Sequence, residues 1–334
     1  MLSQLRLMRL RFGLEVTTPA SLPPYKGDGL RRALLWHLGT MWCRQPERCR
    51  NGCQAPHECL FGQLLEPPPD PAWSEPIRRL MGTTPPPAYV LWDMQDRRRE
   101  VHAGDLFHFE LTLIGEAAIR QLPAFIAAVM VAGERGMGRE QLRARLERVD
   151  ALAGPNGQAH PLLVNGVWQG DPVDDVLVGY SDGQTWAEDH VSRFTFHAPV
   201  TRLQMHFLSP VKVKERGEVA EEPGFPALAR AVVRRLRILS EVHGAGEWPQ
   251  AEYGPLLDLA DTVQLEHHET TWVGTVRHSR QGDMPLEGFV GQAWYASPSD
   301  LRPLLPVLWL GQWLHVGKGG VWGCGTYWVE GVVG

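Results

Sequence analysis

Lysine and cysteine are scarce in this sequence, and a long apolar run is missing. Only four of the 33 basic residues are lysines, so arginine, whose planar fork suits phosphate and carboxylate groups, carries most of the positive charge. A genome rich in arginine codons would produce the same bias. Five cysteines, an odd number, argue against a secreted disulfide framework. The longest apolar run, 122–133, is too short to cross a bilayer, and no signal-peptide core opens the chain. We therefore expect a cytoplasmic protein with no membrane partner.

The charge is slightly negative overall and unevenly distributed. A net charge of −5 over 334 residues argues against a protein that coats nucleic acid by bulk electrostatics. Residues 1–50 nevertheless contain nine basic and three acidic side chains, whereas 241–300 contain two basic and ten acidic ones. Confined basic segments on a net-negative chain favour a selective binder of anions over an unspecific one.

The first half of the chain alternates strand and helix patterns. Alternating apolar residues from Leu10 to Val16 indicate a half-buried strand. The patterns that follow predict a helix over Gly29–Cys43, strands over Ala88–Asp93 and Asp105–Ile114, and a helix over Glu116–Ala132. The stretch Gln141–Val149 fits either a strand or a helix.

The second half repeats this order. The patterns predict a strand over Thr201–Leu208, a helix over Phe225–His243, strands over Thr270–His278 and Leu286–Tyr295, a helix capped by Ser299, and a strand over Tyr327–Val333. Two β-α-β-β-α-β units predict an α+β protein with two tandem ferredoxin-like (RRM-like) domains. We place the first at 1–198, with a Cys-rich and Pro-rich insertion, and the second at 199–334, with a glycine-rich loop.

The glycine-rich loop precedes the last predicted strand. Its glycines allow positive φ angles, and consecutive backbone N–H groups could form a nest for an anion, with a lysine as counter-charge. A tight connection into the last strand is the alternative. The residues concerned are Gly317, Lys318, Gly319, Gly320, Gly323 and Gly325.

Four of the five cysteines are close together in the sequence, at Cys43, Cys49, Cys53 and Cys59. Four thiols could hold a structural zinc ion in a tetrahedral site, although the paired CxxC spacing of the strongest zinc patterns is missing. Reduced, partly buried cysteines are the alternative.

Several motifs together resemble those of a known family. They are Gly288-Phe-Val-Gly-Gln-Ala-Trp-Tyr, the glycine-rich loop, Phe207-Leu-Ser-Pro-Val-Lys-Val-Lys, Val233-Arg-Arg-Leu-Arg, and Pro24-Tyr-Lys-Gly-Asp-Gly with the cysteine cluster behind it. This combination is similar to the CRISPR precursor-RNA processing endoribonucleases of the RAMP superfamily. The likeness covers both ends of the chain.

The resemblance implies a ribonuclease that binds CRISPR repeat RNA hairpins and cuts them by attack of a ribose 2′-hydroxyl. It implies no catalytic metal or cofactor, and other Cas subunits as partners. The reaction needs a base, an acid and a cation for the phosphorane charge. His37, with Tyr25, is the first catalytic candidate and His315 the second; for each histidine a packing role is the alternative. Candidate phosphate contacts are the loop residues and Arg31, Arg32, Lys212, Lys214, Arg230, Arg234 and Arg237.

Two other functions remain open from the sequence. The first is a non-catalytic, RAMP-fold subunit that binds crRNA in an effector complex. The second is a zinc-stabilised protein-interaction module. Cleavage of repeat RNA in the presence of a chelator separates the nuclease from both.

Overall fold

The structure is a computed structural model in which the chain forms two compact units. It describes residues 2–23, 25–43, 53, 58–81, 84–94, 96–139, 141–154, 156–170, 176–195, 199–215, 217–244, 246–277 and 284–333. One unit comprises 6–177 with 242–244, and the other comprises 1–5, 178–241 and 245–334. We call them the N-terminal and the C-terminal unit.

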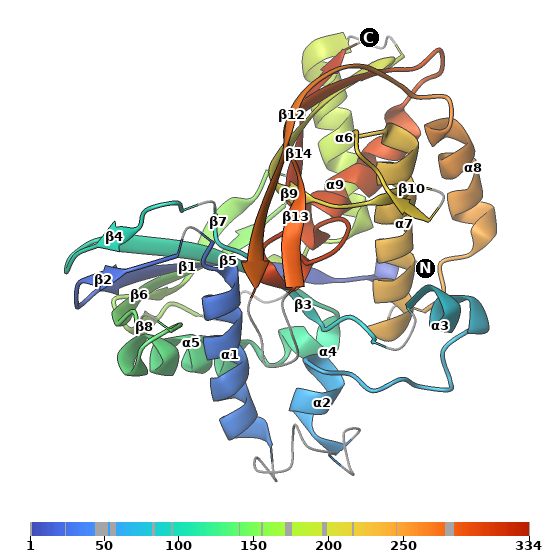
Figure 1. Cartoon of the computed structure of the whole chain (residues 1–334). Coiled ribbons are helices and arrows are strands. Elements are labelled where there is room, and N and C mark those ends of the chain that lie inside the picture. The colour runs from blue at the N-terminus through green and yellow to red at the C-terminus, as the bar shows by residue number, and fades with distance from the viewer. Residues whose placement is uncertain are drawn as a thin grey trace. The chain divides into compact units, whose positions relative to one another are not determined.

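The N-terminal unit is built on a six-stranded antiparallel sheet with the order β3-β5-β1-β6-β7-β8. Its four central strands and two main helices follow one another in the order β-α-β-β-α-β, which is the ferredoxin-like arrangement. These elements are β1 (Leu7–Val16), α1 (Gly27–Trp42), β3 (Tyr89–Trp92), β5 (Leu106–Ile114), α5 (Leu122–Arg135) and β6 (Ala144–Ala153). Helix α1 packs on α5, and α5 packs on β6. The predicted fold class is therefore confirmed for this unit (Figure 1).

Smaller elements extend the N-terminal unit. Strands β7 (Gln158–Val164) and β8 (Val167–Trp168) lengthen the sheet beyond β6, and β2 (Ala20–Ser21) pairs with β4 (Glu100–Val101). Helices α2 (Leu60–Leu64) and α3 (Glu75–Met81) follow α1 in the chain. The single helix predicted over Glu116–Ala132 is two helices, α4 (Glu116–Ile119) and α5, because Pro123 lacks an N–H and starts a new helix.

The alternation of β1 places Leu10, Phe12 and Leu14 in the core. On the opposite face, Glu110 of β5 lies between two arginines of β1. Arg9 donates to Glu110 at 2.6 Å and Arg11 at 2.7 Å, and both Arg9 and Glu110 are buried. A buried carboxylate with two guanidinium partners keeps its charge satisfied.

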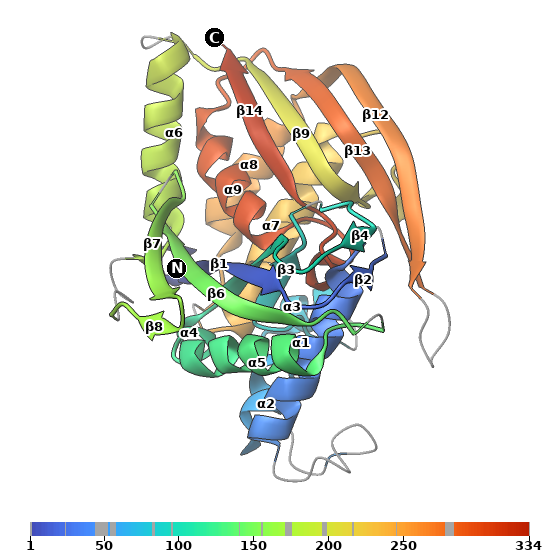
Figure 2. The same cartoon turned by 90° about the vertical axis from the view of Figure 1, so that its left-hand side faces the viewer.

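The C-terminal unit repeats the arrangement with a four-stranded sheet in the order β12-β13-β9-β14. Its elements are β9 (Arg202–Val211), α7 (Phe225–Val242), β12 (Gln264–Arg277), β13 (Met284–Ala296), α9 (Leu305–Leu314) and β14 (Tyr327–Val333). Figure 2 shows the four strands side by side. The predicted strands and helices are thus all present in this unit.

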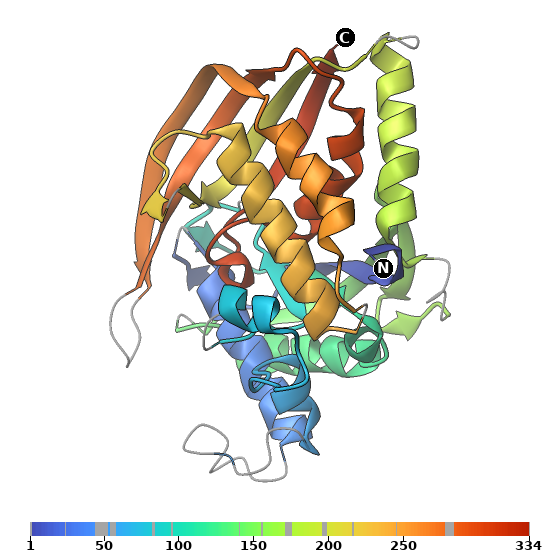
Figure 3. The same cartoon turned by 90° about the vertical axis from the view of Figure 1, so that its right-hand side faces the viewer.

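Further elements of the C-terminal unit complete the list: η1 (Leu2–Gln4), α6 (Tyr180–Thr195), β10 (Lys214–Glu215), β11 (Glu218–Val219), α8 (Gln250–Ala260), η4 (Arg302–Leu304) and η5 (Gly320–Trp322). The η elements are 3₁₀ turns. Helix α8 lies next to α7 (Figure 3). In the described part of the chain, no helix combines the length and the apolar character needed to cross a membrane.

Three expectations about boundaries differ from the structure. Ser299 does not cap the last helix, because a 3₁₀ turn intervenes and α9 begins at Leu305, next to Pro306. Strand β12 begins at Gln264 instead of Thr270, since its polar first residues pair with the end of β13. The two units divide between Leu177 and Val178, before the boundary predicted at 198/199, because α6 packs on α9.

Candidate functional site

A basic pocket of about 440 Å³ lies in the C-terminal unit, at the end of β9. One wall comes from successive turns of α7, and the others come from the chain that leaves β9 and from the glycine-rich loop. Its lining residues are Lys212, Val213, Lys214, Arg230, Ala231, Arg234, Arg235, Ile238, Gly317 and Lys318. Six cations from three separate segments therefore surround one cavity.

Carboxylates neutralise only part of this charge. Lys212 donates to Glu287, and this contact holds the pKa of the Glu287 carboxyl below its usual range. Arg230 contacts Asp261 at 2.5 Å. Because six cations line the pocket and two of them contact a carboxylate among the described residues, the pocket has a positive potential that favours anions.

Arg235 is the most unusual of these cations. Its Nε and Nη2 atoms are withdrawn from solvent and make no hydrogen bond with any residue that the structure describes. Burial lowers the pKa of Arg235 to about 10, so the guanidinium is still charged at neutral pH. A buried charge without a counter-ion is unfavourable, and an anion in the pocket would supply the missing partner.

The glycine-rich loop is folded tightly against the end of β9. Gly317 has φ +76°, and a Cβ at this residue would lie 2.3 Å from the carbonyl oxygen of Lys212. Gly325 has φ +83°, and its Cβ would lie 2.1 Å from the carbonyl oxygen of Val316. Only glycine fits these two positions. The tight packing brings Lys318 to the pocket, next to the lysines that follow β9.

The predicted anion nest is largely absent. The backbone N–H groups of Val316, Lys318, Trp322, Gly323, Cys324 and Gly325 donate to carbonyl oxygens of the protein. They are therefore not directed at a ligand, and Gly319, Gly320 and Gly323 serve the turn around η5. The alternative interpretation, a tight connection into the last strand, describes most of the loop. Gly317 and Lys318 are its residues that line the pocket.

The arginines of α7 divide into two groups. Arg230 and Arg234 line the pocket as predicted, and Lys212, Lys214 and Lys318 join them there. Arg237 does not, because its guanidinium lies over the ring of Tyr253 in α8, at 4.4 Å from the centroid. Arg235 takes its place in the pocket. A sequence signal could have identified Arg235, because positions 231, 234, 235 and 238 lie on one stripe of a helix.

His37 lies in α1 of the N-terminal unit and is 6% exposed. Burial, and after it the positive charge of Arg135 in the last turn of α5, lowers the pKa of His37 below its ordinary value. The imidazole is therefore neutral near pH 7 and able to accept a proton. Arg135 is exposed, so a solvent-accessible cation acts on the histidine.

The other residues predicted near His37 are not grouped around it. Helix α1 begins at Gly27, two residues after Tyr25, and at 1.5 Å per residue Gly27 and His37 are about 15 Å apart along the helix axis. Tyr25 packs instead under Arg97, whose guanidinium is 4.5 Å from the ring centroid. Arg31 lies beside the buried hydroxyl of Tyr89. Arg32 is exposed and pairs with Asp28 within the helix. Tyr25 is thus not the partner of His37 in one acid-base pair.

His315, the second catalytic candidate, lies inside the C-terminal unit. Its side chain is 3% exposed, and Nε2 is 3.4 Å from Oγ1 of the buried Thr326. The residue ends α9 with a φ of +61°. A histidine in this position packs at the helix end, as the packing alternative expects, and its catalytic role stays a prediction.

Comparison with family models covers most of both units. Residues 5–173 match a model described as an N-terminal domain, AF_1859_N. Residues 205–327 match the model of the CRISPR-associated endoribonuclease Cas6. The C-terminal unit of the chain thus contains a match to the Cas6 family of CRISPR-associated endoribonucleases. This match supports a role in CRISPR RNA processing and confirms the resemblance seen in the sequence motifs.

Solved Cas6 structures share the fold of this chain. The product complex of a Cas6 protein from Thermus thermophilus has a TM-score of 0.54 at 14% identity, and the match covers 97% of this chain and 99% of that one. A second Cas6 product complex has a TM-score of 0.50 at 17% identity, with 98% and 100% covered. A partial Cas6-RT-Cas1–Cas2 complex gives 0.60 at 14% identity, with 99% of this chain and 47% of that one covered. Comparison with curated protein sequences gives no match.

One histidine of the N-terminal unit was not among the sequence candidates. His108 of β5 lies opposite Gly13 of β1, on the sheet face that carries the Arg9–Glu110–Arg11 cluster. Burial and then the charges of Arg11 and Arg98 lower its pKa. Its setting in β5 gave no signal in the sequence, because the surrounding arginines are distant along the chain.

The cysteine cluster is only partly visible. Cys43, Cys53 and Cys59 are free thiols, and the Cys59 Sγ accepts a hydrogen bond from the Gly62 N–H at 3.3 Å. Cys49 lies outside the described residues. Among the residues that are described, no group of three or more metal-ligating side chains is present. The structural zinc site stays a prediction.

Proposed function

We propose that this protein is a metal-independent endoribonuclease that cleaves CRISPR repeat RNA by attack of a ribose 2′-hydroxyl on the adjacent phosphate. The observation that carries the RNA part of the proposal is the basic pocket with Arg235, whose Nε and Nη2 have no hydrogen-bond partner among the described residues. The match to the Cas6 family and the product complexes of similar fold support the reaction class. Repeat RNA is then the main partner. The Cas6-RT-Cas1–Cas2 assembly supports other Cas proteins as further partners.

RNA binding follows from the charges of the pocket. A backbone phosphate that enters it meets Arg234 and Arg235 of α7 on one side and Lys214 and Lys318 on the other. Charge-assisted hydrogen bonds to a phosphate are about twice as strong as neutral ones. Such contacts read the shape and backbone of a hairpin, and affinity falls as the salt concentration rises.

The chemical step uses the neutral imidazole of His37 as general base. It takes the proton from the 2′-hydroxyl, the O2′–P bond forms, and the bond from phosphorus to the 5′-oxygen breaks, which leaves a 2′,3′-cyclic phosphate and a 5′-hydroxyl. The protonated imidazole or water returns a proton to the leaving oxygen. Arg135, whose charge acts on His37, stabilises the phosphorane. No step needs a metal ion or a cofactor.

Incubation with repeat RNA tests this proposal. Purified protein is mixed with end-labelled repeat RNA in excess EDTA, and we expect one cut at one position. A substrate with a single 2′-deoxynucleotide on the 5′ side of that position should bind normally and stay intact. His37→Ala should slow cleavage by about 100-fold or more, whereas the matched control His102→Ala, a 75% exposed histidine of the same unit, should cleave as wild type does.

The alternative is a non-catalytic RAMP-fold subunit that binds crRNA. The observation that favours this alternative is the same basic pocket, because such a pocket binds RNA whether or not the RNA is then cut. Binding without any cut, in EDTA and in magnesium alike, would establish this alternative and reject the nuclease. A cut that persists at the full rate in His37→Ala would reject only the assignment of His37, and His108 would be the next histidine to replace.

A further inference from the structure

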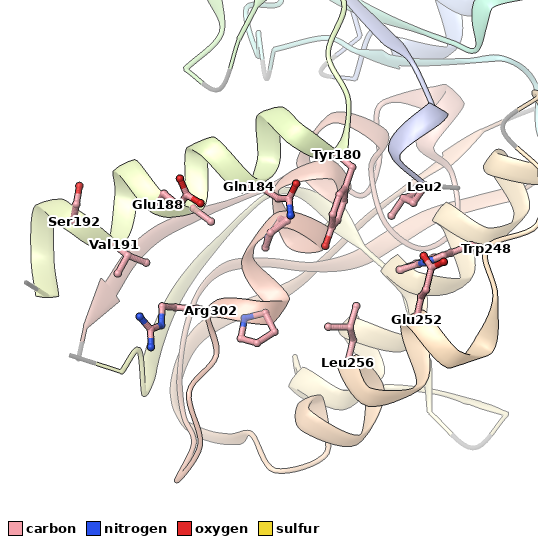
Figure 4. A pocket seen from close by; sticks show the side chains of 13 residues that line it. Leu2, Tyr180, Gln184, Glu188, Val191, Ser192, Trp248, Glu252, Leu256 and Arg302 are labelled. Atoms are coloured by element: carbon pink, nitrogen blue, oxygen red, sulfur yellow. The ribbon is translucent and has the colours of Figure 1, made fainter. Parts of the chain in front are cut away.

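A long groove, separate from the basic pocket, lies in the C-terminal unit between α6 and α8. Its volume is about 990 Å³, more than twice that of the basic pocket. Figure 4 shows side chains of α6 along one side and of α8 on the other, with Leu2 and the chain around Arg302 between them. The residues Tyr180, Gln184, Glu188 and Ser192 mark one stripe of α6, about 18 Å long at 1.5 Å per residue.

The two helices are attached to different neighbours. The Cα of Gly183 in α6 lies against α9 so closely that a Cβ would be 2.9 Å from the carbonyl oxygen of Pro306. Helix α8 is attached to α7 through Tyr253, whose ring lies under the guanidinium of Arg237. Pro303 and Pro306 also line the groove, so the segment around η4 closes it between the facing stripes of α6 and α8.

The groove has mostly apolar walls and acidic rims. Ala187 and Val191 of α6, Leu256 of α8 and the prolines around η4 form the walls. Glu188 and Glu252 line the two sides, both exposed. Among the described residues neither carboxylate pairs with a cation, and Arg302, the only basic residue of the lining, pairs with Asp300 at 2.5 Å.

We propose that this groove binds an amphipathic helix of a partner protein, with apolar side chains at i, i+4 and i+7 and with lysine or arginine beside them. The apolar walls suit the apolar stripe of such a helix, and the length of the α6 stripe suits about three turns. The two uncompensated carboxylates select basic side chains and repel the phosphates of RNA. RNA and the partner helix therefore bind at two separate places of the C-terminal unit, RNA at the basic pocket and the helix at the acidic groove.

A synthetic helix tests the groove directly. The probe is a fluorescein-labelled peptide of about 14 residues with leucines at i, i+3, i+4 and i+7 and lysines elsewhere; the matched peptide has glutamates for the lysines. Fluorescence anisotropy with the full-length protein should show saturable binding of the lysine peptide only. Binding should weaken at least about tenfold in Glu188→Lys/Glu252→Lys and remain unchanged in Glu221→Lys/Glu222→Lys, a pair of exposed carboxylates outside the groove lining.

Two further measurements keep the result interpretable. Methyl NMR should show shifts of Ala187, Val191 and Leu256 on addition of the lysine peptide, and the groove variants should still cleave repeat RNA if the wild type does. Equal binding of both peptides, equal loss in both double variants, or methyl shifts elsewhere would overturn the proposal. A wild-type dimer that Glu188→Lys/Glu252→Lys dissociates would also overturn it, because a second copy of this chain would then be the occupant.

Discussion

Replacement of Arg235 by methionine should weaken RNA binding and at the same time stabilise the free protein. The fall of the Arg235 pKa to about 10 reflects a charge held away from water without a partner. At about 1.4 kcal/mol per pH unit, it corresponds to about 3 kcal/mol of unfavourable desolvation. Methionine keeps the length and removes the charge, so we expect the free energy of unfolding to rise by about 1 to 3 kcal/mol. Urea denaturation measures this change.

The same replacement removes a phosphate ligand. A hydrogen bond from a charged donor contributes about 1.5 to 3 kcal/mol, so the Kd for repeat RNA should rise roughly 10- to 100-fold. The slope of log Kd against log salt should fall by about 0.7 to 0.9, the value for one lost phosphate contact. Filter binding at several salt concentrations gives both quantities.

Arg237→Met on the same helix is the matched control. Its guanidinium stacks on Tyr253 outside the pocket, so this change should leave RNA affinity as it is and lower stability by about 0.5 to 1 kcal/mol. The reasoning is refuted if Arg235→Met lowers the stability of the protein and binds RNA with the wild-type affinity and salt dependence. A structural arginine behaves in that way, whereas an anion ligand shows opposite changes in stability and affinity.

Three other predictions concern the remaining parts of the chain. Cleavage should slow as the pH falls through the pKa of His37, which lies below its ordinary value, because the protonated imidazole accepts no proton. Arg135→Gln removes a charge that lowers this pKa, so the acid limb of the pH-rate profile should move to higher pH. An unchanged midpoint would contradict the assignment of His37. Gly325→Ala should lower the free energy of unfolding by about 2 to 4 kcal/mol. The matched control Gly217→Ala should lower it by about 1 kcal/mol, because Gly217 has a similar φ but open space around it. Equal urea midpoints of the two variants would contradict this prediction. Elemental analysis of the native protein should find about one zinc per chain if the four clustered cysteines bind a metal, and only a small fraction of an equivalent would reject the site.

The order of strands and helices was readable from the sequence. Alternation of apolar and polar residues in β1 and β9 indicates which side of each strand is buried. The apolar stripe of α7 indicates the side of the helix that packs on the sheet. These patterns depend on neighbours along the chain, so they predicted two ferredoxin-like units and the last strand, Tyr327–Val333, with its observed bounds. The basic residues after β9 and in the glycine-rich loop were also identified, since they are motifs of contiguous residues.

Tertiary structure decided which of these residues act together. The sequence of α7 shows that Arg234 and Arg235 share one stripe, but only the structure shows that this stripe lines the pocket and that Arg237 lies over Tyr253 of α8. His315 is buried because the glycine-rich loop returns the chain to it and places the buried Thr326 against its ring. The groove between α6 and α8 exists only because each helix is attached elsewhere. Sequence periodicity reports that a face is buried, but the partner that buries it is chosen by contacts between segments far apart in the chain.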